Sequence, residues 1–242
     1  MGNILNRLFR KENWMEIDSQ VALSDAVKRY GVLPFFPNIV KGFSIEEMAA
    51  PGMLFGGNSG MEGCWEWKGP VIQEMTSGYG KFFKRKAGFV SLELLPDFLN
   101  YRRGEYTIRP DSTEALILEM IQANEGLTST ELRKEILGPP RRKKYDEEGF
   151  EIERPSRSSL EGPLQRLQMG GYILIADFQY KYTKRGDKYG WGVALYSTPE
   201  IWFGNDLKMP DRSPEESFWR MVKEVNSRLP EGNRKLVAKL LE

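Results

Sequence analysis

The chain has 242 residues, with 35 basic and 34 acidic side chains and a formal net charge of +1. This length allows one large domain or two small ones, and the balanced charge excludes a global attraction to polyanions, so any basic surface must come from local clustering. The sequence contains no histidine and one cysteine, Cys64, which excludes an internal disulfide, histidine-dependent nucleophilic sites, and metal sites built on histidine or on several cysteines. We therefore expect no metal and no cofactor. Because no run of about 18 apolar residues occurs, we also expect a cytoplasmic protein without membrane contact.

The first part of the chain combines a helical pattern with a glycine-rich stretch. Residues 18–30 carry an apolar helical stripe, with Asp18 in position to cap the helix. Glycines then surround Trp65 and Trp67, which we expect on one face of a strand, with Glu66 on the other. The two indoles are either a buried aromatic anchor or a stacking platform for a nucleobase.

Aromatic and basic residues alternate between Tyr79 and Val90, a pattern that predicts a strand or a hairpin. Such a mixture is typical of a nucleic-acid-binding face, but equally of a half-buried strand whose lysines face water. The candidate phosphate contacts here are Lys81, Lys84 and Arg85. A helix should follow over residues 92–101, and we place a domain boundary near residues 107–111, where Pro110 interrupts the pattern.

Three helical patterns and two strand-like runs follow one another in the second half. The helices are expected at residues 112–124, 129–137 and 158–169, and the strands at 172–182 and 189–196, joined by a polar turn that contains a glycine. This is the order of elements in a winged helix-turn-helix domain, whose third helix usually enters a groove of the DNA. The pattern therefore favours nucleic acid as the partner.

Basic residues gather at three places in this half. The connection before the third helix carries Arg141, Arg142, Lys143 and Lys144, which are candidate phosphate contacts or part of a solvated loop. The third helix offers Arg157, Gln165 and Arg166 as candidates for contacting base edges. The hairpin carries Lys181, Lys184, Arg185 and Lys188 against one acid, Asp187, the strongest local concentration of positive charge that we find.

Two more helices are expected at the C-terminal end. Ser213, followed by proline and then glutamate at the third helical position, begins the first, and Asn233–Leu241 forms the second. The chain then divides into an N-terminal α+β domain (1–110), for which a divergent winged helix is one interpretation, a winged helix-turn-helix domain (111–205) and a C-terminal helical segment (206–242). The predicted fold class is α+β, with winged helices that we expect in tandem.

Several segments resemble bacterial proteins described as related to AlkZ. They are Trp65–Pro70, Tyr79–Phe83, Gly88–Ser91, and the stretch from Gly171 through Tyr196 with Thr198–Glu200 and Trp202–Gly204 after it. The likeness covers most of residues 20–205. The AlkZ and YcaQ glycosylases are built from tandem winged helices and excise alkylated or crosslinked purines from DNA. The resemblance therefore implies tandem winged helices, double-stranded DNA as partner and a link to DNA repair.

One motif of those glycosylases is missing. They carry a Gln-x-Gln or Gln-x-Asp pair that positions water, neither of which occurs here, and the nearest analogue, Leu174–Asp177, keeps an acid but lacks the glutamine. Whether the protein is an enzyme therefore stays open. Glycosidic hydrolysis needs a carboxylate near the sugar, for which Asp177 and Glu66 are the candidates, and Trp65 or Trp67 could stack on a flipped base.

The sequence supports three functions. The first, which we favour, is a DNA-binding winged-helix protein linked to DNA repair. The second is a DNA glycosylase that acts on alkylated bases. The third is a winged helix that mediates protein–protein contacts, as the near-neutral net charge of +1 would allow. A homodimer would need a two-fold interface, for which the C-terminal helices are a source.

Overall fold

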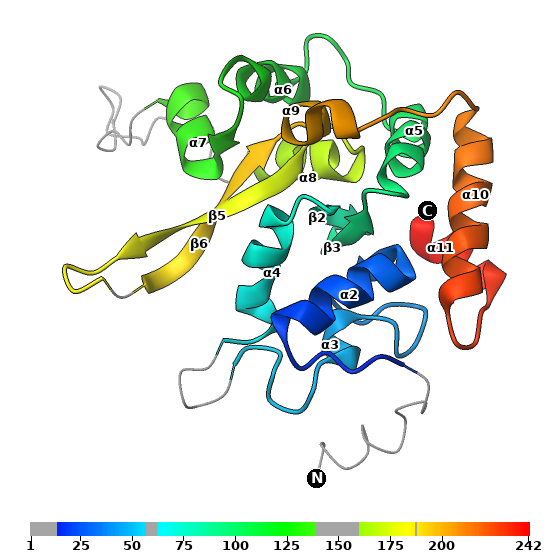
Figure 1. Ribbon diagram of the computed structural model, residues 1–242. Helices are drawn as coiled ribbons and strands as arrows, with labels where there is room; N and C mark the ends of the chain where they lie inside the picture. The colour runs from blue at the N-terminus through cyan, green and yellow to red at the C-terminus, as the bar shows by residue number, and fades with distance from the viewer. Residues whose placement is uncertain (1–13, 57–61, 139–159, 187) are drawn as a thin grey trace, which may run out of the picture.

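The computed structural model describes residues 14–56, 62–138, 160–186 and 188–242, with the backbone alone at 188, 189 and 191. The first half of the chain contains α2 (Gln20–Tyr30), β1 (Val32–Pro34), α3 (Ile45–Met48), α4 (Cys64–Gln73), β2 (Ser77–Phe83), β3 (Lys86–Ser91) and α5 (Leu95–Glu105). The second half contains α6 (Thr113–Ala123), β4 (Leu127–Thr128), α7 (Ser129–Leu137), α8 (Glu161–Met169), β5 (Leu174–Tyr182) and β6 (Lys188–Ser197). The chain ends with α9 (Pro199–Phe203), η2 (Gly204–Asp206), α10 (Pro214–Arg228) and α11 (Arg234–Leu241) (Figure 1).

The two halves repeat one topology. Each runs helix, short strand, helix, helix and β-hairpin, and each builds a three-stranded antiparallel sheet, in the order β1-β3-β2 in the first half and β4-β6-β5 in the second. The mixture of helices and small antiparallel sheets confirms the predicted α+β class. The duplication itself could not be recognised in the sequence.

Local capping signals explain where several helices begin. Ser112 Oγ accepts the Ala115 N–H at the start of α6. Thr128 and Glu131 form a reciprocal capping box at the start of α7, and Ser213 and Glu216 form another at α10. These starts were predicted. At α2 the cap is Ser19 rather than the expected Asp18, a shift of one residue.

The predicted strand around Trp65 and Trp67 is wrong, because both residues lie on helix α4. The glycine-rich loop before the helix stabilises its first turn: Cys64 N donates to Met53 O at 2.7 Å, and the Glu66 carboxylate accepts the Gly63 N–H at 3.1 Å. Residues two apart on a helix point in different directions. The two indoles therefore do not share a face, as a strand would have required.

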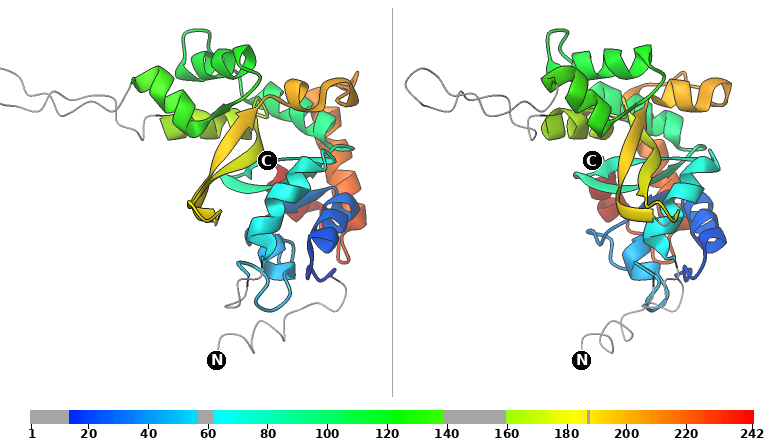
Figure 2. Two further views of the ribbon diagram at one scale, coloured as in Figure 1. Left: turned by 60° about the vertical axis from the view of Figure 1, so that its left-hand side comes forward. Right: turned by 90° about the vertical axis from the view of Figure 1, so that its left-hand side faces the viewer.

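The two halves meet along α4 and β2 on one side and α8 and β5 on the other. Gln73 Nε2 donates to Ala176 O at 2.8 Å, and the Lys81 N–H donates to Gln168 Oε1 at 3.0 Å. The rings of Tyr79 and Phe178 meet edge to face across the same boundary. Figure 2 shows the β5–β6 hairpin running down the side of the molecule next to α4. These contacts join the two halves.

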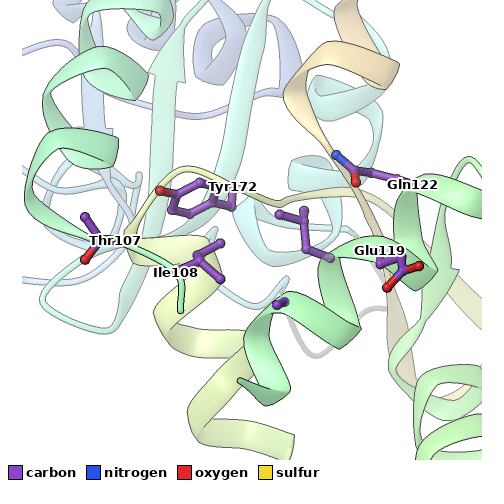
Figure 3. Close-up of a pocket in the computed structure, with 7 residues that line it drawn as sticks. Thr107, Ile108, Glu119, Gln122 and Tyr172 are labelled. Atoms are coloured by element: carbon purple, nitrogen blue, oxygen red, sulfur yellow. The ribbon is translucent and has the colours of Figure 1, made fainter. Parts of the chain in front are cut away.

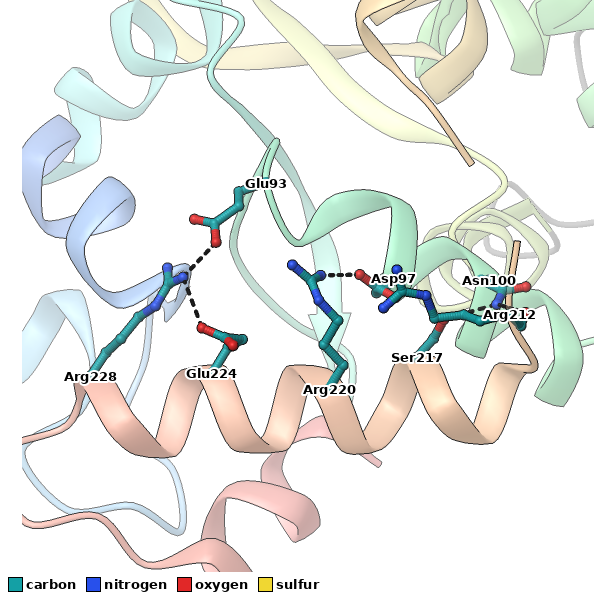
Figure 4. A network of polar contacts seen from close by, with 8 residues as sticks. All are labelled: Glu93, Asp97, Asn100, Arg212, Ser217, Arg220, Glu224 and Arg228. Carbon is teal, nitrogen blue, oxygen red and sulfur yellow. Dashed lines mark hydrogen bonds and ion pairs between the residues drawn. The ribbon is translucent and has the colours of Figure 1, made fainter. Parts of the chain in front are cut away.

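The C-terminal helices pack on the first half, where α10 lies along α5 and also contacts α2. Figure 4 shows the polar network between α10 and α5. The buried carboxylate of Asp97 pairs with Arg220 and, at 3.6 Å, with Arg212. Arg228 pairs with Glu93 at 2.7 Å. The apolar face of α10 is buried within the chain, and a dimer interface on these helices stays a prediction.

Candidate nucleic-acid interface

The end of the first hairpin exposes three of the predicted phosphate contacts. Lys81 is exposed on β2, and Lys84 and Arg85 are exposed in the turn that joins β2 to β3. The hairpin is anchored on both sides: the Lys86 ammonium donates to Pro37 O at 3.0 Å, and the backbone N–H of Lys81 donates to Gln168 of α8. The sequence left a nucleic-acid face and an ordinary surface strand open, and both remain compatible with this placement.

The second hairpin exposes the other cluster. Lys181, Lys184 and Arg185 are all exposed near its end, which extends away from the body of the molecule (Figure 1). The Arg185 N–H donates to Thr183 Oγ1 at 3.2 Å, which shapes the turn. Lys188 begins β6, but its side chain lies outside the described part of the structure, as does Asp187.

Helix α8 has the place in the second half that the sequence assigned to the third helix. Its Arg166 is exposed, but the guanidinium pairs with Glu114 of α6, so an acid of the chain itself neutralises this candidate. Gln165 is half-buried. Arg157 and the basic run Arg141–Lys144 lie outside the described residues.

The two candidate catalytic carboxylates come from different halves and lie near one phenol. Burial raises the pKa of Tyr180, and the carboxylates of Glu66 and Asp177 raise it further. Glu66 is engaged as a helix cap, whereas Asp177 Oδ1 accepts the N–H of Phe178 at 2.7 Å beside a bulge of β5. Both carboxylates therefore lie within electrostatic range of Tyr180, on two contacting elements, α4 and β5, although they are 111 positions apart in the sequence (177 − 66).

Lys68 lies at the same junction and was not predicted. The side chain is 2 % exposed, its ammonium donates to Trp65 O, and it lies 4.0 Å from the ring centre of Trp65. Burial lowers the pKa of Lys68 to about 8, although the Glu66 carboxylate acts in the opposite direction. The sequence signal for its burial is the spacing of Cys64, Lys68 and Val71, which lie on one face of a helix. The predicted strand placed these residues differently, so the signal was missed.

A cavity of about 470 Å³ lies beside the connection between the halves (Figure 3). It is lined by Thr107, Ile108, Ala115, Leu118, Glu119, Gln122 and Tyr172. A second cavity of about 300 Å³ shares part of this lining and includes the Arg166–Glu114 pair. Neither cavity contains Glu66, Asp177 or the two tryptophans, so the structure separates them from the predicted catalytic candidates.

The described residues form neither a membrane-spanning helix nor a cluster of metal ligands. None of their helices is long and apolar enough to cross a membrane. In the same part of the chain, no group of three or more cysteine, aspartate or glutamate side chains is arranged to hold a metal ion.

Comparison with known proteins places the chain in a family. No protein with curated annotation matches the sequence. A solved structure, the DNA glycosylase AlkZ of Streptomyces sahachiroi, is similar with 13 % identity and a TM-score of 0.47, covering 88 % of this chain and 52 % of that one. The chain thus spans about half the length of that glycosylase. A family model described as AlkZ related matches residues 17–242, and the chain belongs to the AlkZ-related family.

Proposed function

We propose that the protein binds double-stranded DNA through two winged helix domains in tandem and acts in DNA repair. The observation that carries this proposal is the repeated topology, in which each half contains a hairpin that exposes a Lys-Arg pair. The pairs are Lys84-Arg85 and Lys184-Arg185. Helix, strand, helix, helix and hairpin is the order of a winged helix, and cations in a hairpin turn are placed to contact phosphates. The name of the AlkZ-related family supports the link to repair.

The two halves contribute differently in this proposal. In the second half, α8 would enter a groove, with Arg166 exchanging Glu114 for the DNA. In the first half, the third helix is α4, which contacts β5 and whose one lysine, Lys68, is buried. No other cation lies on α4, and Glu74, which follows it, pairs with Lys28 at 3.7 Å. The first half would therefore contact DNA through its hairpin and not through its third helix.

The experiment is a binding titration of the full chain with a fluorescent duplex, followed by anisotropy. Lys184→Gln/Arg185→Gln should weaken binding at least tenfold at about 0.1 M salt, because two phosphate contacts are lost. The matched control is Lys223→Gln/Lys235→Gln, which removes the same charge from exposed positions of α10 and α11. If the two double variants weaken binding equally, binding reflects only a nonspecific attraction between charges. If the wild-type protein does not bind the duplex, the proposal is wrong.

Base excision is the second candidate, and the packing of α4, which carries Glu66, against β5, which carries Asp177, favours it. Asp177 is the better candidate for the carboxylate that stabilises a positively charged sugar, because Glu66 already caps α4. Trp65 or Trp67 would stack on the extruded base, each on its own because the two do not share a face.

Excision should be assayed on duplexes that contain alkylated purines. The Asp177→Asn variant should lose at least a hundredfold in rate, whereas the exposed Asp211→Asn serves as the control. If unchanged protein excises a base and Asp177→Asn does so at the same rate, the assignment of this carboxylate is wrong.

A further inference from the structure

The turn between β2 and β3 has an unusual backbone for its residues. Lys84 and Arg85 have φ angles of 46° and 70°, and Phe83 pairs with Lys86 directly across them. Two-residue turns with positive φ at both positions favour Asn-Gly or similar residues, because a Cβ is disfavoured in this conformation. Of the four non-glycine residues with positive φ in the described part of the chain, two are these neighbours.

No described contact compensates for this backbone. The side chains of Lys84 and Arg85 are exposed, and neither makes a hydrogen bond, ion pair or ring contact with another described residue. The strands beneath the turn are firmly held, because Phe82 and Phe83 are buried and Arg102 donates to Phe82 O at 3.2 Å. The fold therefore presents two cations that have no partner among the described residues, on well-packed strands and in a conformation that disfavours their side chains.

The second hairpin provides an internal comparison. There Lys184 and Arg185 precede Gly186, and the glycine takes the positive φ of 90°. The same dipeptide is thus presented without backbone strain in one hairpin and with strain in the other. A Lys-Arg pair at a position where the backbone disfavours it points to a role for the side chains outside the chain itself.

We propose that the Lys84-Arg85 turn is a phosphate clamp that binds the backbone of the duplex beside α8. The Lys81 N–H donates to Gln168 Oε1 of α8 at 3.0 Å, and β2 packs against that helix, so the hairpin is attached to α8. Phosphates held by the turn would fix the position of α8 along the duplex without reading sequence. This inference rests on the proposed DNA binding and deepens it, because it gives the turn of the first hairpin a defined role in positioning α8.

The test is Lys84→Asn/Arg85→Gly, which gives the turn the residues that its backbone favours. The variant should unfold at a higher temperature than the unchanged protein and yet bind the duplex at least tenfold more weakly. The slope of log affinity against log salt should become shallower by about 1.8, because each phosphate contact contributes about 0.9. A structural role for the two residues could not produce higher stability together with weaker binding.

Two further variants complete the design. Lys84→Arg/Arg85→Lys keeps both charges and should bind within threefold of the unchanged protein. Lys184→Asn/Arg185→Asn should weaken binding without raising the unfolding temperature, because Gly186 already takes the positive φ. If the wild-type protein binds DNA and the Lys84→Asn/Arg85→Gly variant binds with the same affinity and salt slope, the proposed phosphate clamp is wrong, but the proposed DNA binding is not affected. If the unchanged protein binds no duplex, both proposals fall.

Discussion

The ammonium of Lys68 in α4 lies 4.6 Å from the ring centre of Phe178 in β5, across the boundary between the two halves. The same ammonium contacts the ring of Trp65, so the charge is held between two aromatic faces. Among the described residues it forms no ion pair with a carboxylate within 4.0 Å. This contact joins the halves and places a poorly solvated charge in their interface.

The pH dependence of stability should report this buried charge. The pKa of Lys68 is about 8 in the folded protein, below its ordinary value of 10.5. At pH values between these two, the unfolded chain therefore binds more protons than the folded chain. The contribution of Lys68 to stability is therefore lowest below the folded pKa and rises as pH increases toward the unfolded value. Lys68→Met, of similar length and without charge, should abolish the rise.

The measurement is the difference in free energy of unfolding between unchanged protein and Lys68→Met, from urea titrations between about pH 7 and about pH 10. Using the difference cancels the opposite effects of Cys64 and Tyr79, whose raised pKa values reduce stability at high pH in both proteins. A difference that does not change with pH would contradict the assignment.

The buried carboxylate of Asp97 should be a main determinant of how α10 is held. Asp97→Ala removes the partner of Arg220 and Arg212 and should cost about 2 to 3 kcal/mol, below the ~3–5 kcal/mol of a fully buried pair because both arginines reach solvent. Glu224→Gln is the control, since it breaks one partly exposed pair and should cost less than about 0.5 kcal/mol. Urea titrations measure the free energy of unfolding of both variants. If the two variants lose the same stability, the Asp97 network contributes no more than an exposed ion pair.

Glu114 should restrain DNA binding, because it occupies the guanidinium of Arg166. Glu114→Gln frees this cation and should strengthen duplex binding severalfold, with a salt slope steeper by about 0.9. Glu119→Gln changes the net charge equally on the same helix and is the control. Anisotropy titrations measure the duplex affinity of both variants. If the affinity of the two variants increases equally, only the net charge of the protein affects binding.

Short-range signals in the sequence predicted much of the fold. Ser112, Thr128 and Ser213 each cap a helix through residues three positions away, so a local pattern is enough to locate them. The helix at Trp65 was missed because its start depends on loop residues such as Met53, ten or more positions earlier, and on a glycine that carries no capping side chain.

The candidate site was less predictable because its decisive contacts join distant residues. The pairing of Arg166 with Glu114 spans 52 positions, and nothing in the local pattern indicates it. The positive φ values at Lys84 and Arg85 were equally hidden, since the usual Asn-Gly signal for such a turn is absent. The elements that carry Asp177 and Glu66 meet only through the packing of β5 against α4, which joins distant parts of the sequence.

The most direct test of the central claim is the salt dependence of duplex binding by the unchanged protein. If the exposed cations of the two hairpins form one continuous contact with the phosphate backbone, four to six phosphates should be neutralised, and log affinity should fall against log salt with a slope of about −4 to −5. A slope near zero, or no measurable affinity for duplex DNA at about 50 mM salt, would contradict the account.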